Sequence, residues 1–206
     1  MNVAVINGSS RTDSQSKKVA EWMVMCLSGL LAGQGSVNMI SMEGSPLPFW
    51  HEDMWSPGSA IREHWQGYAD LLDSVDAFVV VTPEWNGMPP ADLLNFFHFA
   101  TTTGGLKYKP AMLVGVSDTM GGSYPVATLR QVVGKNSKLV ILPDHVIVRW
   151  SKDALIGEDE PDEDEAKLRK RILYSLKALM AFSDAFRGVR DSGVLNDQEE
   201  GCRNGM

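Results

Sequence analysis

The stretch TPEWNGMPPADLLN, residues 82–95, decides the fold because it follows the apolar run DAFVVV, residues 76–81, without a break. The β-branched run predicts a strand buried in a parallel sheet. The residues after Pro90 have helical spacing, and proline is tolerated in the first turn of a helix. Between strand and helix lies a stiff, polar turn that contains Trp85. An ordinary connection between a strand and a helix needs only a few polar residues. The prolines and the tryptophan of this turn therefore indicate that it keeps its shape in order to contact a ligand.

The same order of strand and helix repeats along the whole chain. Strands are predicted within residues 2–8, 36–42, 76–82, 110–117 and 138–148, and helices within 16–33, 61–75, 90–103, 120–135 and 157–186. This alternation predicts an α/β protein with a doubly wound parallel sheet and helices on both faces. Residues 1–187 are expected to form a single domain, and the polar residues 188–206 a mobile tail.

The composition limits the classes of function. The chain has 206 residues, is 44% hydrophobic and carries a net charge of −7. An acidic chain is a poor general binder of nucleic acid, although a local anion site stays possible. No stretch reaches the roughly 18 apolar residues of a membrane span, and the N-terminus lacks the basic start of a signal peptide. The chain is therefore predicted to be cytoplasmic.

The two cysteines give no sign of a metal site or of a disulfide framework. Cys26 lies in a predicted helix and is expected to be a small buried apolar residue. Cys202 lies in the polar tail, and neither residue stands at metal-ligand spacing from others. We expect no bound metal.

Three loops at one edge of the predicted sheet are unusual. In doubly wound sheets, ligands bind outside the carboxyl ends of the strands. Residues 8–16, 82–90 and 117–124 each follow one of the three most apolar strands, and each is rich in glycine, proline or polar residues. We expect a ligand site where these loops meet.

The first loop, GSSRTDSQS at residues 8–16, has the chemistry of an anion site. It combines hydroxyl groups with Arg11 at the start of a predicted helix, where backbone N–H groups and the helix dipole favour an anion. Asp13 would repel an anion, so its side chain is expected to point outward. The loop lacks both the G-x-G-x-x-G and the Walker patterns. An ordinary serine-rich helix cap would need similar residues, so that alternative stays open.

The loops also carry a resemblance to a known family. GSSRTDSQSKKVA, TPEWNGMPPADLLN and VSDTMGGSYPVATLRQVV resemble, in order, the motifs of the NADPH-dependent FMN reductase family. The resemblance covers residues 2–145. It implies a flavodoxin-like three-layer sandwich with strand order 2-1-3-4-5. It also implies FMN as cofactor, NADPH or NADH as co-substrate, and a homodimer or homotetramer.

By this resemblance the first loop holds the FMN phosphate and the other two loops border the flavin ring. The N–H groups of Trp85, Asn86 and Gly87 would face the polar edge of the ring. No side chain need act as an acid or base, because the cofactor carries the chemistry. The implied cofactor-binding residues are Ser9, Arg11, Ser14, Gln15, Ser16, Pro83, Glu84, Trp85, Asn86, Gly87, Ser117, Asp118, Gly121 and Gly122.

The sequence departs from the family pattern at several positions. Trp85 stands where tyrosine is usual, Leu94 replaces a lysine, and His98 replaces an acidic residue. An inward-pointing Asp118 would disfavour an anionic reduced flavin. His98 is expected to be a packed or surface histidine, and Arg130 to be structural or interfacial.

The aromatic loop 44–59 is either an anchor at an interface or a wall of the site. The acidic run 158–165 is expected to be a solvated loop and helix start.

The function implied is hydride transfer from NAD(P)H through FMN to a small acceptor such as a quinone, free flavin, azo compound or metal oxyanion. The alternatives are a flavodoxin-like electron carrier and a non-catalytic binding protein on the same fold.

Overall fold

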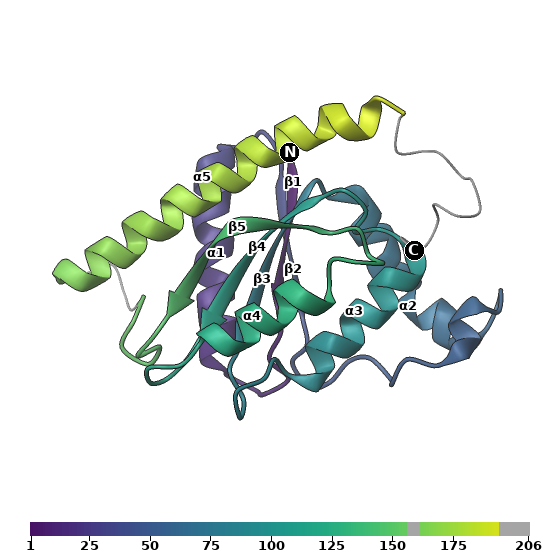
Figure 1. Ribbon diagram of the computed structural model, residues 1–206, viewed down its shortest axis with the longest axis horizontal. Helices are drawn as coiled ribbons and strands as arrows, with labels where there is room; N and C mark the ends of the chain where they lie inside the picture. The colour runs from purple at the N-terminus through teal and green to yellow at the C-terminus, as the bar shows by residue number, and fades with distance from the viewer. Residues whose placement is uncertain (156–160, 194–206) are drawn as a thin grey trace.

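The computed structural model describes residues 1–155 and 161–193 and confirms the predicted fold (Figure 1). A five-stranded parallel sheet has the order β2-β1-β3-β4-β5. The strands are β1 Asn2–Asn7, β2 Ser36–Ser41, β3 Ala77–Pro83, β4 Pro110–Val116 and β5 Val140–Val148. The helices are α1 Gln15–Leu31, α2 Ala60–Ser74, α3 Ala91–Thr103, α4 Ser123–Val132 and α5 Glu163–Asp191, with a short 3-10 helix η1 at Glu52–Trp55.

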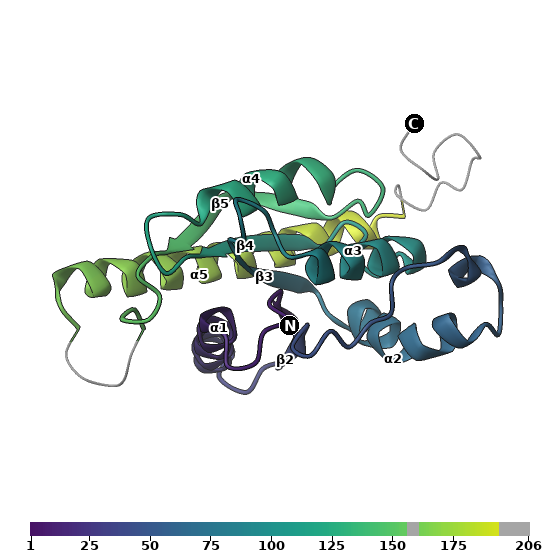
Figure 2. The same ribbon diagram turned by 90° about the horizontal axis from the view of Figure 1, so that it is seen from below.

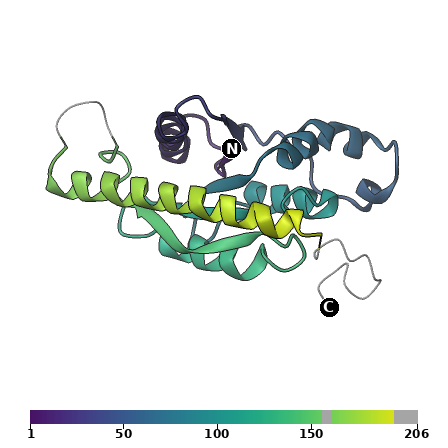
Figure 3. The ribbon, with the colours of Figure 1, turned by 90° about the horizontal axis from the view of Figure 1, so that it is seen from above.

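The two faces of the sheet pack against different helices, as expected for three layers (Figures 2 and 3). Along β1, Ala4 and Ile6 face the core beneath α2, α3 and α4. Val3 and Val5, which alternate with them, face the core beneath α1 and α5. Every residue of β3 and β4 is buried, which explains why these strands are apolar throughout.

The strand register brings the predicted loops together. Asn7 of β1 lies opposite Val81 of β3, Pro83 lies opposite Val116 of β4, and Val116 lies opposite Val148 of β5. Because the strands are parallel, their carboxyl ends form a single edge. The loops after β1, β3 and β4 therefore meet there, and so does the segment after β5.

Helix α5 is longer than the sequence predicted, since its end was expected at residue 186. The helix continues to Asp191, and its C-terminal end is tied to the body of the protein. Arg190 donates to the carbonyl of Tyr108 at 3.2 Å, and both Arg187 and Arg190 lie 3.5 Å from Asp76 Oδ1. Composition suggested a polar tail from residue 188, but it could not reveal these distant partners. Figure 3 shows α5 running across the molecule.

The acidic run 158–165 was predicted to form a solvated loop and the start of this helix. The structure describes residues 161–165 of this run. Asp162 caps α5 by accepting a hydrogen bond from the N–H of Glu165 at 2.8 Å, and three acidic residues fill the first turn. Acidic groups there complement the helix dipole. Residues 158–160 and Cys202 lie outside the described residues.

Cys26 is half-buried rather than buried, because it lies at the edge of the α1 face that packs on the sheet. Burial raises the pKa of its thiol to about 11, so the thiol is protonated near neutral pH. Within residues 1–155 and 161–193, no helix is both long and apolar enough to cross a membrane.

Candidate functional site

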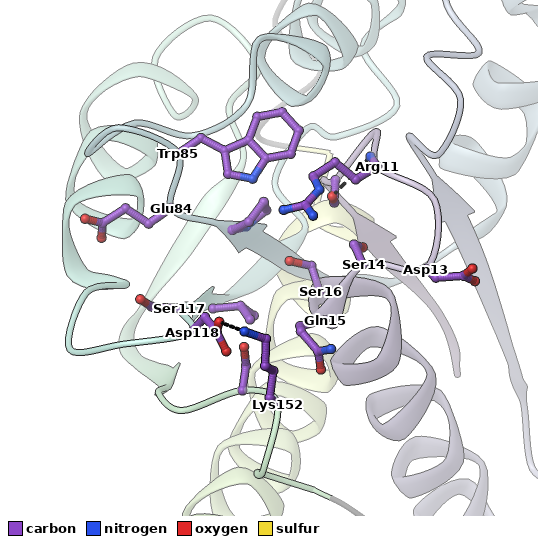
Figure 4. Close-up of a pocket in the computed structure, with 14 residues that line it drawn as sticks. Arg11, Asp13, Ser14, Gln15, Ser16, Glu84, Trp85, Ser117, Asp118 and Lys152 are labelled. Carbon is purple, nitrogen blue, oxygen red and sulfur yellow. Dashed lines mark hydrogen bonds and ion pairs between the residues drawn. The ribbon is translucent and has the colours of Figure 1, made fainter.

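A cavity of about 270 Å³ opens at the carboxyl edge of the sheet (Figure 4). It is bordered by the loops after β1, β3 and β4 and by the segment after β5. The predicted residues that line it are Ser9, Arg11, Ser14, Gln15, Ser16, Pro83, Glu84, Trp85, Ser117 and Asp118. The lining residues that were not predicted are Asp13, Val116, Ser151 and Lys152. The structure therefore brings the three predicted loops together and adds a fourth segment.

Gly8 fixes the path of the first loop. Its N–H donates to the carbonyl of Val81 at 2.8 Å, and a Cβ at Gly8 would lie 2.7 Å from the Leu93 side chain. The loop can only run this close to β3 and α3 without a side chain at this position. Ser9 follows with its side chain buried, and its Oγ accepts from the N–H of Arg11 at 3.4 Å.

The loop ends at the N-terminus of α1, which points into the cavity. Ser14 caps the helix, since its Oγ accepts from the N–H of Lys17 at 3.1 Å. Gln15 and Ser16 form the first turn and line the cavity. Lys17 is turned aside by an ion pair with Glu43 at 2.6 Å, an interaction that raises the pKa of Lys17 and lowers the pKa of Glu43. The positive end of the helix dipole therefore faces the cavity, which favours an anion.

Arg11 and Asp13 take opposite orientations in Figure 4. The guanidinium of Arg11 extends toward the cavity, whereas the carboxylate of Asp13 is directed away from it, as expected from the sequence. Asp13 has a left-handed backbone with φ of 51°. Within the described ranges, no side chain pairs with the Arg11 guanidinium. The charge that faces the cavity from this loop is thus positive.

The turn after β3 is tighter than the sequence interpretation assumed. Asn86 and Gly87 have φ values of 50° and 76°, and Trp85 and Met88 exchange backbone hydrogen bonds of 3.0 and 2.9 Å. Two successive positive φ values define a type I′ turn, for which Asn-Gly is the favoured pair. The N–H of Trp85 is therefore used inside the turn, so its prediction as a ligand donor is wrong. Asn86 and Gly87 form the tip of the turn and do not line the cavity.

Glu84 lines the cavity but its carboxylate does not point into it (Figure 4). Its Oε2 accepts a hydrogen bond from the N–H of Gly122 at 2.5 Å, and its own N–H donates to the carbonyl of Val116 at 3.0 Å. Glu84 thus joins the turn after β3 to the loop after β4.

The two glycines of the third loop, Gly121 and Gly122, do not line the cavity. Gly122 is the N-cap of α4 with φ of 101°, and a Cβ there would lie 2.6 Å from Ile147. A Cβ at Gly121 would lie 3.1 Å from the Glu84 carboxylate. Arg149 holds the loop from the opposite side, because its Nε donates to the carbonyl of Met120 at 2.7 Å. These glycines allow the loop to close on its neighbours.

Ser151 and Lys152 are the functional candidates that the sequence interpretation missed. Lys152 forms an ion pair with Asp118 across the cavity rim (Figure 4). Asp118, which was expected to disfavour an anionic reduced flavin if it pointed inward, is therefore paired with a cation. The family resemblance stopped at residue 145. Both residues nevertheless directly follow a predicted strand, as the other three loops do. Their position after that strand could therefore have predicted that they lie at the same edge of the sheet.

Unpartnered buried polar atoms supply a test of whether this cavity fits a ligand. Among the described residues, the buried side-chain atoms without a hydrogen-bond partner are Gln15 Oε1, Ser151 Oγ and Ser175 Oγ. The first two belong to residues that line the cavity. A buried polar atom without a partner costs about 1–3 kcal/mol. A hydroxyl-rich phosphate ester would satisfy both atoms and the helix N-terminus, so the residues present fit FMN.

The aromatic loop 44–59 lies elsewhere. Asn95 of α3 holds it: Asn95 Nδ2 donates to the carbonyl of Pro48, and its Oδ1 accepts from the N–H of Trp50, both at 2.8 Å. Trp50 and Trp55 line a groove of about 730 Å³ between α3 and α4. No residue of this loop lines the cavity at the carboxyl edge, so the loop is not a wall of the site within its own chain.

Two other residues singled out from the sequence also lie outside the cavity. His98 is exposed beside the α3–α4 groove, 6.3 Å from the Trp50 ring centre. Arg130 donates to the carbonyl of Pro143 at 2.8 Å and serves a structural contact within the chain. The described residues contain no group of three or more metal-ligating side chains.

The family model described as NADPH-dependent FMN reductase matches residues 1–152. This chain belongs to that family. The match ends on Lys152 and thus includes all four segments around the cavity. A family member is an FMN-dependent NAD(P)H oxidoreductase, with FMN as cofactor and a reduced nicotinamide as co-substrate.

Known relatives agree with this assignment. A quinone reductase of Pseudomonas putida is 30% identical over 189 residues, covering 90% of this chain and 92% of its own length. The solved structure of an oxidoreductase from Corynebacterium diphtheriae has a TM-score of 0.69 at 18% identity, with 89% of this chain and 97% of that chain covered. FerB, a flavoenzyme NAD(P)H:(acceptor) oxidoreductase of Paracoccus denitrificans, has a TM-score of 0.63 at 23% identity, with 91% and 97% covered.

Proposed function

We propose that the cavity at the carboxyl edge holds FMN and that the protein passes electrons from NAD(P)H to a small acceptor, with residues 1–187 acting as one flavin-binding domain. The observation that carries this proposal is the convergence of the α1 N-terminus, the Arg11 guanidinium and two unpartnered polar atoms on one cavity. When bound, FMN supplies reversible two-electron chemistry between the nicotinamide and the acceptor. The protein supplies binding, orientation and electrostatics.

The first loop binds the phosphate in this proposal. Arg11 provides charge-assisted hydrogen bonds, Ser9 and Ser16 provide buried hydroxyls, and the first turn of α1 provides N–H groups. Ser14 Oγ caps the helix by accepting the N–H of Lys17, and its O–H is still free to donate to the phosphate. This arrangement contains no lysine in the loop, which suits a phosphate that is held rather than transferred.

The second and third loops border the flavin ring in this proposal. Trp85 offers a flat apolar surface and one indole N–H donor, and Pro83 stiffens the strand end beside it. Ser117 adds a hydroxyl from the end of β4. Asn86, Gly87, Gly121 and Gly122 act indirectly, by fixing the shape of the two loops.

The acceptor we favour is a quinone. The curated relative in Pseudomonas putida is a quinone reductase at 30% identity. Exposed apolar side chains that follow β3 and β4 also suit a planar, weakly polar acceptor: Met88 in the turn after β3 is 57% exposed, Met120 in the loop after β4 75%, and Tyr124 in the first turn of α4 68%. Free flavin, azo compounds and metal oxyanions are further candidates for the same position.

We further infer a homodimer or homotetramer in the cytoplasm. The support comes from large apolar side chains exposed near the α3–α4 groove, since Phe49 is 85% exposed, Trp55 66% and Val132 56%. Exposed patches of this kind are typical of interaction surfaces. A second copy of the chain that covers this face would bury them.

The test is a titration of the apoprotein with FMN and with riboflavin, followed by anaerobic addition of NADPH or NADH, with Arg11→Ala beside the wild type. The proposal expects tight FMN binding, a loss of at least about tenfold in FMN affinity in the variant, and little change for riboflavin, since a charge-assisted phosphate contact is lost. Either nicotinamide should bleach the bound flavin. Flavin that binds but is not reduced would favour an electron carrier. A folded protein that ignores FMN would favour a binding protein without redox activity.

A further inference from the structure

The segment after β5 forms a tight turn at the cavity. Trp150 has a left-handed backbone with φ of 50°, and its carbonyl accepts hydrogen bonds from the N–H groups of Asp153 and Ala154 at 2.9 and 3.1 Å. The N–H of Ser151 donates to the carbonyl of Ser117 at 3.2 Å. The turn therefore places Ser151 beside the end of β4. A non-glycine residue in this backbone region is uncommon.

Ser151 brings an unsatisfied hydroxyl to this position. The residue is 1% exposed, it lines the cavity, and no described residue hydrogen-bonds its Oγ. Gln15 Oε1, which comes from α1, is a second buried oxygen without a partner in the same lining. Two such atoms from distant segments around one cavity indicate a ligand that hydrogen-bonds to both of them.

The charges around the cavity give Lys152 a distinct role. The charged lining residues are two cations, Arg11 and Lys152, and three anions, Asp13, Glu84 and Asp118. Figure 4 shows the carboxylates of Asp13 and Glu84 directed away from the cavity. Asp118 remains as the acidic group at the rim, and Lys152 pairs with it. Without Lys152, an anionic ligand would meet an uncompensated carboxylate.

We propose that Ser151 and Lys152 complete the cofactor cavity opposite the first loop, with the Ser151 hydroxyl hydrogen-bonding the bound ligand and Lys152 neutralising Asp118, so that the cavity accepts a doubly charged phosphate monoester. This inference rests on the proposed function and adds residues to its site. The side chains of Lys152 and Asp118 are 67% and 44% exposed, so their ion pair contributes little to folding. Substitutions at Lys152 are therefore expected to leave the fold intact.

The experiment measures dissociation constants for FMN and riboflavin in Lys152→Met, Asp118→Asn, the double variant and Ser151→Ala. Lys152→Met should weaken FMN binding about tenfold and riboflavin binding less than about twofold, because riboflavin lacks the phosphate. The double variant should return FMN affinity to within about twofold of the wild type. Ser151→Ala should weaken FMN binding a few-fold while leaving the ligand-free protein as stable or more stable, since an unsatisfied buried hydroxyl is removed.

Lys18→Met is the matched control. Lys18 Nζ reaches the carbonyl of Lys152 at 3.4 Å, so this variant removes an equal charge nearby, but Lys18 does not line the cavity. It should change FMN affinity less than about twofold. Equal losses in Lys18→Met and Lys152→Met, or equal losses for FMN and riboflavin in Lys152→Met, would overturn the inference, as would Ser151→Ala with unchanged affinity.

Failure of the proposed function gives a separate result. If the folded wild type binds neither flavin, FMN is the wrong ligand, and the same variants are titrated with inorganic phosphate by calorimetry. Phosphate binding that weakens in Lys152→Met and recovers in the double variant would support the charge-neutralising role of this segment. A wild type that binds no phosphate either would overturn it.

Discussion

The carboxylate of Glu84 accepts the N–H of Gly122 at 2.5 Å, and this contact joins two loops whose parent strands lie side by side. Gly122 is the N-cap of α4, and it has no side chain with which to cap the helix. Glu84 therefore places a negative charge at the positive end of α4 from a different loop. This side chain therefore connects the turn that carries Trp85 to the loop that carries Asp118.

Glu84→Ala should weaken both the fold and the site. The substitution leaves the Gly122 N–H without its acceptor, at a cost of about 1–3 kcal/mol in the free energy of unfolding. Because the side-chain contact between the two loops is then lost, FMN affinity should fall by about tenfold. Urea unfolding and flavin titration measure the two effects. Glu84→Gln is the matched control, since it keeps an oxygen acceptor and should retain most of the affinity. FMN binding as tight in Glu84→Ala as in the wild type would contradict the role of this contact.

Gly122→Ala and Gly67→Ala should have opposite effects on stability. At Gly122 a Cβ would lie 2.6 Å from Ile147 and φ is 101°, so alanine should cost about 1–3 kcal/mol and loosen FMN binding. Gly67 lies inside α2, and no atom lies within 4 Å of a Cβ built there. Alanine at Gly67 should stabilise the protein by about 0.5–1 kcal/mol. Thermal unfolding of both variants tests the pair. Similar stability changes at the two positions would show that the third loop does not need its glycine.

The sequence predicted the fold well because the central strands carry a simple pattern. Residues 77–83 and 110–116 are buried on both faces of the sheet, so they read as apolar runs bounded by turns. The first loop could be predicted for a similar reason: hydroxyl groups and Arg11 before a helix have one clear physical use. Its expected residues line the cavity.

The roles of the other two loops depended on contacts that a linear pattern does not contain. The N–H of Trp85 donates to the carbonyl of Met88, and the Glu84 carboxylate accepts from the N–H of Gly122. Both bonds form because of the way the turns fold in space. The Asn-Gly pair at residues 86–87 could have predicted the tight turn, because this pair is favoured in type I′ turns. Lys152 meets Asp118 only through the β4–β5 register, so neither residue alone revealed the ion pair.

Asn95→Ala should release the aromatic loop without disturbing the cavity. Asn95 is 9% exposed and forms two hydrogen bonds of 2.8 Å to Pro48 and Trp50, so its loss should cost about 2 kcal/mol. Limited proteolysis should cut within residues 44–59 faster, while FMN affinity stays within about twofold of the wild type. Thr102→Val removes the 3.0 Å bond from Trp50 Nε1 to the loop and the 2.9 Å bond that Thr102 Oγ1 donates to the carbonyl of His98 within α3, and it should have a smaller effect on the loop. A large loss of FMN affinity in Asn95→Ala would mean that the loop takes part in the site.

Lys109 should make the stability of the protein depend on pH in the alkaline range. The side chain is 9% exposed, and its Nζ donates to the carbonyls of Leu72 and Asp73, at 2.6 and 3.1 Å, at the end of α2. Burial lowers the pKa of Lys109 from 10.5 to about 8. Between these two values the unfolded chain binds more protons than the folded chain. The free energy of unfolding should therefore rise with pH in this window, by at most about 3 kcal/mol. Below the window Lys109 is protonated in both states, so it should add no pH dependence to the free energy of unfolding.

Lys109→Met removes this titration and leaves the two carbonyls without a donor. The variant should be less stable than the wild type near neutral pH by about 1–3 kcal/mol, and the gap between the two proteins should widen as the pH rises from about 8 to about 10. Urea unfolding across this range measures both quantities. Lys107→Met, at an exposed position two residues earlier, is the matched control and should follow the wild type at every pH. A constant gap between Lys109→Met and the wild type would mean that Lys109 keeps its proton throughout the range, and that its hydrogen bonds to the end of α2 outweigh the effect of burial.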